Sequence, residues 1–291
     1  MSVIEHVLKI GNEIGEAPIW VPEESCLYWC DTEGFRIFRY RPADSVFESF
    51  SVSFPVTALL RRRGGGWVLV TKKGLVFWDQ ESGHCEFIID PTDGQADLCF
   101  NDGAVDRQGR IVSGTMNARQ HVRPDGRLYR LNTRLDLVEL DANLSVANGI
   151  GFSLDGKTMY VSEQFAGRVL AYDYDPGEGL PSNRRVFAEI LPEEGKPDGI
   201  IIDAEGFVWN GRWGGGTIVR YAPDGSVDRR YALPVETATC LAFGGEKLDE
   251  LYLTTASYGL DARGRKENPY AGDLFVLRPG ISGIVEPRFA G

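Results

Sequence analysis

Three stretches of the sequence place a carboxylate or amide side chain eight residues before a glycine. The pairs are Asn101 with Gly109, Asn148 with Gly156, and Asp198 with Gly206. An apolar, β-rich run follows each leading residue, which is typical of a strand that ends in a tight turn. Carboxylate and amide oxygens are the ligands that hard divalent cations prefer. Metal-assisted chemistry therefore becomes possible if the fold brings these leading residues together.

These stretches belong to a longer repeat that predicts the fold. Six units, each starting with a polar residue before an apolar strand, begin between 41 and 50 residues apart, near Glu16, Thr57, Asn101, Asn148, Asp198 and Thr239. Helical periodicity is nearly absent, and many of the 35 glycines separate short β-rich runs. Repeats of roughly 40–50 residues with about four strands each are typical of propeller blades. We predict an all-β, six-bladed β-propeller that forms one domain over residues 1–291.

The predicted fold gives the leading residues a common location. The first strand of each propeller blade lines the central channel, so Glu16, Asn101, Asn148 and Asp198 should converge at one mouth of it. Two carboxylates and two amides are unfavourable to bury together without a cation. The oxygen donors predict one divalent ion, with calcium, magnesium, manganese and zinc as the alternatives. A histidine-ligated zinc site is not expected, because none of these residues is histidine.

Other segments are predicted to complete the fold. The strand over residues 4–10 should join the last blade and remove an exposed sheet edge. Five tryptophans are expected in the core: Trp20, Trp29, Trp67, Trp78 and Trp209. Trp213 lies in a glycine-rich stretch, and we expect it to face a ligand.

Composition restricts the classes of partner and compartment. The chain has 291 residues, 31 of them basic and 42 acidic, which gives a net charge of −11. This balance argues against nucleic acid and anionic membranes as partners. No apolar stretch approaches the ~20 residues of a membrane helix, and the first residues do not resemble a signal peptide. With five cysteines and no C-x-x-C pair, we expect a cytoplasmic protein with reduced thiols.

Several short motifs, in this order, resemble the regucalcin/gluconolactonase family, also called the senescence-marker-protein family. They lie at residues 15–20, 27–31, 100–103, 114–116, 147–149, 197–199, 213–215 and 243–245. The resemblance spans the whole chain and implies a six-bladed propeller that hydrolyses sugar lactones with one divalent metal in its channel. It implies metal ligation by Glu16, Asn148 and Asp198. It also implies that Asn101 contacts the substrate or the outer shell of the metal.

Two departures from the family pattern concern the substrate. Cys99 stands where many members have arginine, and Arg119 stands where some members have glutamate. The second exchange suggests a lactone with an anionic substituent, such as a sulfonate or carboxylate, that Arg119 binds. The alternative is that Arg119 is a solvated loop residue. With Asn117 and Trp213, these residues complete the candidate substrate-binding set.

The predicted activity is metal-dependent opening of a sugar lactone to the sugar acid. Asp198 is the candidate general base, because it would contact both the metal and the attacking water. A phosphotriesterase-like hydrolase is an alternative, since the same ion would polarise a phosphoryl group. A non-catalytic propeller that binds calcium or a protein partner is another.

Overall fold

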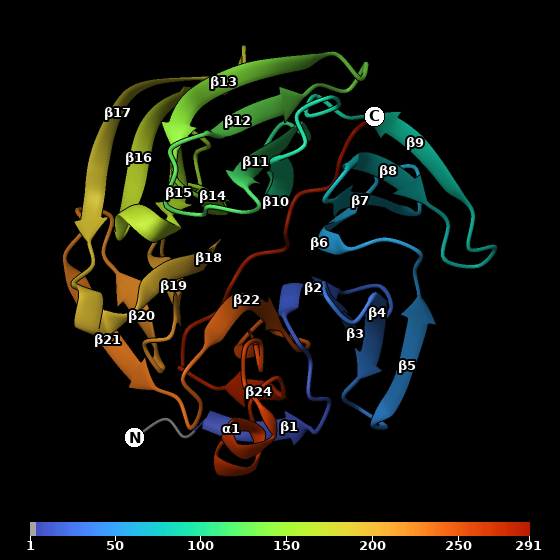
Figure 1. The fold of residues 1–291 in the computed structure, drawn as a ribbon, viewed down its shortest axis with the longest axis vertical. Helices are drawn as coiled ribbons and strands as arrows, with labels where there is room; N and C mark the ends of the chain where they lie inside the picture. Colours follow the sequence, from blue (N-terminus) through green and yellow to red (C-terminus); the bar gives the residue numbers. More distant parts are fainter. Residues whose placement is uncertain (1–3) are drawn as a thin grey trace. The chain divides into compact units, whose positions relative to one another are not determined.

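The computed structural model describes residues 4–291, and its regular structure is almost entirely β-strand (Figure 1). The helices in this part of the chain are short: η1 (Gln164–Ala166), η2 (Pro192–Glu194) and α1 (Ala262–Glu267). Within residues 4–291, none of them has the length and apolar character needed to cross a membrane. The near absence of helix predicted from the sequence is therefore confirmed.

The chain forms two compact units. Unit 1 comprises the residues up to Pro55 together with Ile190–Val285, and unit 2 comprises Val56–Glu189 and Glu286–Gly291. Each unit contains three four-stranded antiparallel sheets. The prediction that residues 1–291 form one domain stays a prediction.

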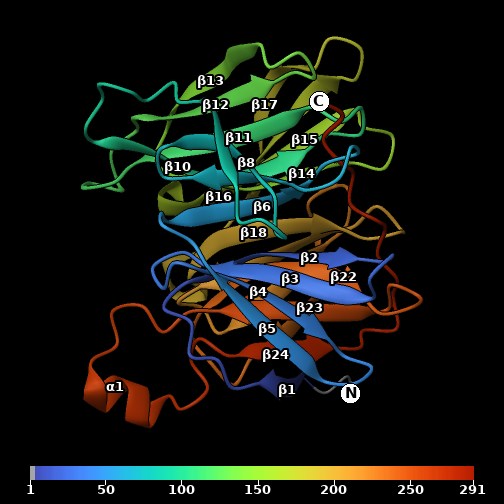
Figure 2. The same cartoon turned by 90° about the vertical axis from the view of Figure 1, so that its right-hand side faces the viewer.

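Unit 1 contains three sheets. The first is β2 (Gly15–Val21), β3 (Cys26–Asp31), β4 (Arg36–Arg41) and β5 (Val46–Ser51). The second is β18 (Lys196–Ile202), β19 (Val208–Trp213), β20 (Thr217–Tyr221) and β21 (Val227–Ala232). The third is β22 (Ala238–Gly244), β23 (Glu250–Thr255), β24 (Leu274–Leu277) and β1 (Ile4–Leu8). Because β1 pairs with β24, the predicted role of the N-terminal strand is confirmed. Helix α1 lies on a projecting connection between β23 and β24 (Figure 2).

Unit 2 repeats the same arrangement. Its first sheet is β6 (Val56–Arg61), β7 (Trp67–Thr71), β8 (Gly74–Trp78) and β9 (Cys85–Ile89). The second is β10 (Leu98–Val105), β11 (Ile111–Asn117), β12 (Gly126–Leu131) and β13 (Leu137–Leu144). The third is β14 (Ala147–Phe152), β15 (Thr158–Glu163), β16 (Arg168–Asp175) and β17 (Leu180–Glu189).

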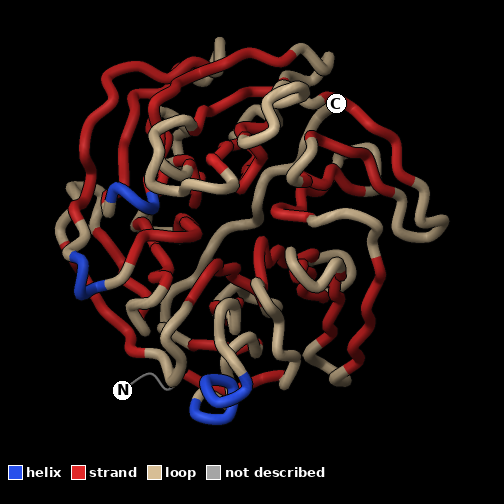
Figure 3. The backbone as a smooth tube through the Cα atoms, in the orientation of Figure 1, coloured by secondary structure: helices blue, strands red, loops and turns tan. Residues whose placement is uncertain are grey.

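The first strands of neighbouring sheets contact one another within each unit. In unit 1, β22 contacts both β2 and β18, and in unit 2, β10 contacts both β6 and β14. All residues of β14 and β22 are buried, whereas most residues of the outer strands β5, β17 and β21 are exposed. The short strands and turns of each sheet can be followed in Figure 3. The first strands are the more buried ones because their sequences are continuous apolar runs, and a strand buried on both faces does not alternate between polar and apolar residues.

Aromatic residues fill the cores of the sheets. The five tryptophans expected there are at most 9% exposed, which confirms that prediction for Trp20, Trp29, Trp67, Trp78 and Trp209. All five cysteines are free thiols. The core therefore forms without disulfide support.

A buried aspartate holds the turn between β18 and β19. One oxygen of Asp203 accepts hydrogen bonds from the backbone N–H groups of Glu205, at 2.9 Å, and Phe207, at 3.0 Å. Its other oxygen accepts from the indole of Trp209 and from Arg220, each at 2.8 Å. Asp203 is fully buried, so these four donors compensate for the loss of water.

The same device recurs between β10 and β11. Asp106 is fully buried and accepts from the backbone N–H groups of Gln108, at 3.0 Å, and Arg110, at 2.9 Å. Its second oxygen accepts from the Arg110 guanidinium at 2.6 Å and from the Tyr174 hydroxyl at 2.9 Å. Two of the glycine turns that define the repeat, at Gly109 and Gly206, are thus fixed by buried charge as well as by backbone geometry.

We predict that Asp203→Ala lowers the free energy of unfolding by at least about 2 kcal/mol, because it leaves buried donors without an acceptor. Asp224 provides a matched control, since its exposed carboxylate caps a turn by accepting from Ser226. Asp224→Ala should change the free energy of unfolding by less than about 1 kcal/mol. Urea unfolding followed by circular dichroism measures both variants, and equal losses would contradict the assignment.

Candidate active site

Every first strand contains a break in pairing register at the polar residue with which its repeat begins. The breaks lie between Glu16 and Ile19, Val56 and Ala58, Phe100 and Asp102, Asn148 and Ile150, Pro197 and Ile200, and Ala238 and Leu241. A β-bulge bends its strand and re-aims the local side chains. The six residues predicted to start the repeats therefore coincide with the six β-bulges of the first strands.

In unit 1, one side chain of β22 contacts the predicted metal ligand Glu16 and the residue that follows the predicted ligand Asp198. The thiol of Cys240 donates a hydrogen bond to Oε2 of Glu16 at 2.9 Å. Gly199, which follows Asp198, lies so close that a Cβ there would be 2.5 Å from the Cys240 sulfur. Asp198 is fully buried and Glu16 is partly buried. The structure therefore brings the β2 and β18 bulges to the same residue.

A buried amide fixes the bulge around Asp198. The Nδ2 atom of Asn210, on β19, donates to the backbone oxygens of Asp198, at 2.9 Å, and Gly199, at 3.0 Å. Asn210 is fully buried. Since a bulge interrupts the regular ladder, a side-chain donor supplies hydrogen bonds at the interruption. The backbone that carries Asp198 is therefore held from the neighbouring strand.

In unit 2, Asn101 and Asn148 lie on adjacent first strands. Nδ2 of Asn101 donates to the backbone oxygen of Ala147 at 3.3 Å, next to Asn148 in the chain. Oδ1 of Asn148 accepts from the N–H of Gly149 at 3.0 Å. Gly149 has a φ of +40°, a left-handed value that favours glycine. The structure thus brings these two predicted oxygen donors to neighbouring positions.

Asp102 is a buried carboxylate next to the candidate residue Asn101, and it was not among the residues predicted from the sequence. Its carboxylate accepts from the N–H of Gly103 at 2.7 Å and is buried. Burial raises the pKa of Asp102 to about 7, although hydrogen bonds from the backbone of Gly103, Ile150 and Gly149 act in the opposite direction. Regular alternation would separate Asp102 from the face of Asn101. The Asn-Asp-Gly sequence at the start of the repeat is the feature of the sequence that could have identified Asp102.

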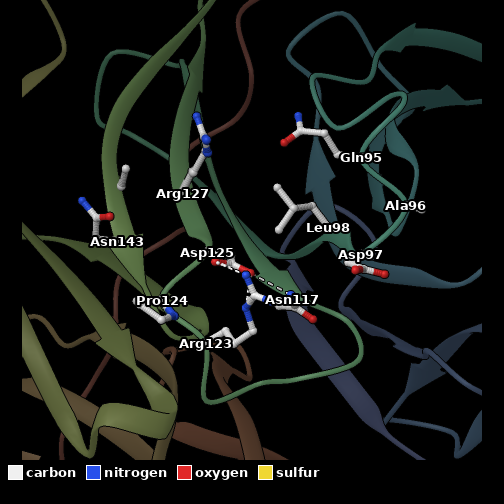
Figure 4. A pocket seen from close by; sticks show the side chains of 11 residues that line it. Gln95, Ala96, Asp97, Leu98, Asn117, Arg123, Pro124, Asp125, Arg127 and Asn143 are labelled. Atoms are coloured by element: carbon white, nitrogen blue, oxygen red, sulfur yellow. Dashed lines mark hydrogen bonds and ion pairs between the residues drawn. The ribbon is translucent and has the colours of Figure 1, made fainter.

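A polar cavity of about 390 Å³ opens beside the start of β10 (Figure 4). Asn117 lies in its lining, and its Nδ2 donates to Asp125 at 2.8 Å. Oδ1 of Asn117 accepts from the backbone N–H groups of Arg119, at 3.0 Å, and Gln120, at 2.8 Å. Asn117 therefore organises its own loop, and a substrate would have to compete with these hydrogen bonds.

The two residues that depart from the family pattern have different environments. Cys99 is 5% exposed and pairs with Met116 across the sheet. Arg119 is largely exposed and forms an ion pair with Asp97 at 3.0 Å. The cation predicted to meet an anionic substrate already has a carboxylate partner.

Trp213 lies at the end of β19 and is partly buried. Its ring meets that of Tyr258 edge-on, with 6.5 Å between the ring centroids. The N–H of the next residue, Gly214, donates a hydrogen bond to Oγ1 of Thr237, just before β22, at 3.3 Å. Trp213 and the more exposed Tyr258 therefore form an aromatic pair in the unit that also contains Glu16 and Asp198.

The donor chemistry fits a hard divalent cation. Within residues 4–291, no three side chains of histidine, cysteine, aspartate and glutamate form a metal-binding group by themselves. A site built from the predicted ligands therefore needs amide oxygen as well as carboxylate, as calcium and magnesium sites commonly have. Glu16 and Asp198 belong to unit 1, and Asn101 and Asn148 belong to unit 2. The meeting of Glu16, Asn148 and Asp198 at one ion stays a prediction.

The raised pKa of Asp102 predicts a pH-dependent stability in metal-free protein. The folded protein binds a proton at Asp102 more tightly than the unfolded chain does, so stability should fall as pH rises towards 7. Asp102→Asn removes this titration. Between pH 5 and pH 8, wild type should lose about 2–3 kcal/mol relative to Asp102→Asn, measured by urea unfolding with chelator. Parallel stability profiles for the two proteins would contradict the prediction.

Comparison with known proteins relates this arrangement to a family. The model of the SMP-30/Gluconolactonase/LRE-like region matches residues 14–257. Regucalcin of Xenopus laevis is 33% identical, over 99% of this chain and 98% of its own. L-arabinolactonase of Azospirillum brasilense is 34% identical, over 96% of this chain and 93% of its own.

A solved structure supports the same relationship. The crystal structure of regucalcin from Agrobacterium tumefaciens, described as a calcium-binding protein, superposes with a TM-score of 0.94. It is 27% identical and covers 100% of this chain and 98% of its own. Together with the six four-stranded sheets, this similarity confirms the predicted all-β, six-bladed β-propeller fold. The chain belongs to the SMP-30/gluconolactonase/LRE-like family.

Proposed function

We propose that this protein hydrolyses a sugar lactone to the corresponding sugar acid with the help of one divalent metal ion. The observation that carries the proposal is that Cys240 binds the Glu16 carboxylate of one bulge and packs against Gly199, the residue after Asp198, in another. The similarity to an L-arabinolactonase supports the substrate class. The similarity to a calcium-binding regucalcin supports the ion.

Glu16, Asn148 and Asp198 would hold the ion, which is calcium, magnesium, manganese or zinc. When bound, it would polarise the lactone carbonyl and stabilise the negative charge that develops on the carbonyl oxygen. The two carboxylates would balance the charge of the ion. The amide of Asn148 would add a neutral oxygen donor, which is compatible with any of these four ions.

Asp198 would act as the general base. Its carboxylate takes a proton from a water molecule as the water oxygen bonds to the lactone carbonyl carbon. The bond between that carbon and the ring oxygen then breaks, and the proton passes to the ring oxygen. The products are a carboxylic acid and a hydroxyl group on one open chain. Full burial of Asp198 keeps competing water away and so strengthens its interactions with the reacting atoms.

The remaining candidate residues would orient the sugar. Asn101 uses Nδ2 to bind Ala147, so its Oδ1 would accept a hydrogen bond from a sugar hydroxyl. Cys99 and Asn117 would contact the substrate from the same part of unit 2. Trp213 would offer an aromatic surface to the C–H face of the sugar. Positioning of this kind suffices for much of the rate enhancement in an easy ring opening.

Asp198→Asn should lower kcat by about 10²–10⁴-fold, because the amide does not accept the proton from water. Asp224→Asn, in an exposed turn, should leave kcat unchanged. The assay follows proton release from five- and six-membered sugar lactones, with circular dichroism as the test of folding. Folded Asp198→Asn with the turnover of wild type would remove Asp198 from the mechanism.

The same preparation distinguishes the alternative functions. Lactone turnover should disappear with chelator and return with one added divalent ion. Higher kcat/KM for an aryl phosphotriester than for every lactone would favour the phosphotriesterase alternative. Ion binding without turnover of either substrate class would favour a non-catalytic calcium-binding propeller.

The proposal extends to an anionic substituent on the lactone, such as a sulfonate or carboxylate, bound by Arg119. The ion pair of Arg119 with Asp97 is largely exposed, and exposed pairs contribute only about 0–1 kcal/mol. Arg119 would therefore exchange Asp97 for an anionic substrate at little cost. Asp97 would then act as a competitor whose removal helps anionic lactones.

Arg119→Ala should lower kcat/KM for an anionic lactone about tenfold and leave that for a neutral lactone within about twofold. Asp97→Asn should raise kcat/KM for the anionic lactone alone. Parallel steady-state kinetics on both lactones measure these effects. Equal losses on the two substrates in Arg119→Ala would refute the anionic substituent while leaving lactone hydrolysis in place.

A further inference from the structure

We infer that Cys240 is a positioning residue of the metal site, where its thiol orients the Glu16 carboxylate by a neutral hydrogen bond. The inference rests on the metal binding of the proposed function. It concerns a residue that would hold a ligand in place, with no bond between sulfur and the ion.

The contacts of β22 with β2 show how the carboxylate is held. The Cys240 sulfur lies 2.9 Å from Oε2 of Glu16, although 224 residues separate them in the chain. The preceding residue, Thr239, donates through Oγ1 to the backbone oxygen of Gly15. Two consecutive residues of β22 therefore bind two consecutive residues of β2. One contact fixes the backbone and the other fixes the side chain.

The other neighbour of Cys240 limits the size of its side chain. A Cβ on Gly199 would lie 2.5 Å from the Cys240 sulfur and 2.8 Å from the Cys240 Cα. Cys240 is only 7% exposed. The backbone beside Asp198 therefore packs directly against the group that binds Glu16. A larger donor at position 240 would displace one of the two carboxylate-bearing strands, so only a small donor fits.

The backbone of Cys240 is itself anchored. Its N–H donates to Oγ1 of Thr254 at 3.2 Å. Thr254 is fully buried on β23. The backbone that carries the thiol is therefore held at a defined place within the bulge of β22.

A neutral donor suits a metal ligand better than a cation would. A lysine or arginine at this place would orient Glu16 but would also cancel the charge that attracts the ion. A thiol orients the carboxylate and leaves its negative charge available. Groups that orient metal ligands commonly alter metal affinity by 10–100-fold when they are removed. The thiol of Cys240 is in the right place to have an effect of this size.

The test is isothermal titration of calcium chloride and of manganese chloride into chelator-treated, dialysed protein. We expect Cys240→Ala to raise the Kd for the metal 10–100-fold. Cys240→Ser keeps a small neutral donor, so its Kd should stay within about threefold of wild type. Cys26→Ala is the matched control, because Cys26 is a buried thiol in the same unit that donates to a backbone oxygen, that of Glu24. Its Kd should be unchanged.

A second measurement separates positioning from general packing. The rise in Tm on adding saturating metal should be smaller for Cys240→Ala than for wild type, and unchanged for Cys26→Ala. A packing defect would lower Tm with and without metal by the same amount. Cadmium-loaded wild type should show no ultraviolet charge-transfer band that depends on Cys240.

Four outcomes would overturn the inference. They are equal Kd values for Cys240→Ala and wild type, failure of serine to restore binding, equal Tm shifts, and a sulfur-to-cadmium band that Cys240→Ser abolishes. The first three would leave the proposed function intact, since wild type would still bind metal and open lactones. A flat titration of wild type would refute the metal dependence of the proposed function and this inference with it.

Discussion

A polar side chain on a buried or partly buried strand is tolerated only where it finds partners that replace water. This constraint governs the first strand of every sheet here. The backbone relieves it by breaking the pairing register at the polar residue, at all six corresponding positions. The breaks that make the strands compatible with their polar residues also aim those residues at specific partners. The register breaks thus account both for the local structure of these strands and for the direction of the candidate functional side chains.

The partners differ between the two units. In unit 1, the Glu16 carboxylate meets a thiol and the backbone beside Asp198 packs against the same thiol. In unit 2, amides and backbone N–H groups dominate, and Asp102 has a raised pKa because burial outweighs the hydrogen bonds that it accepts. Buried aspartates elsewhere, such as Asp203, have charged partners and serve the turns. Burial alone therefore does not distinguish a structural carboxylate from a candidate functional one. The identity of its partners does.

The sequence predicted what depends on local pattern and spacing. The repeat gave the six sheets, the six starting residues, the tryptophan core and the pairing of the N-terminal strand, because each follows from periodicity or from turn chemistry. The sequence pattern did not predict contacts between segments that lie far apart in the chain. The hydrogen bond of Cys240 joins it to a residue 224 positions away, and Asp102 lies at a bulge that breaks the alternation used to assign faces. Arg119 was identified as a cation, but its pairing with Asp97 follows from loop conformation, which local sequence does not determine.

Oxygen donors from separate repeats are proposed to hold one divalent ion. Anomalous diffraction from crystals grown with manganese chloride, recorded on both sides of the manganese absorption edge, tests this proposal most directly. We expect one strong anomalous peak within bonding distance of oxygens from Glu16, Asn148 and Asp198. Fully occupied manganese elsewhere, with these three side chains apart and no peak between them, would contradict it.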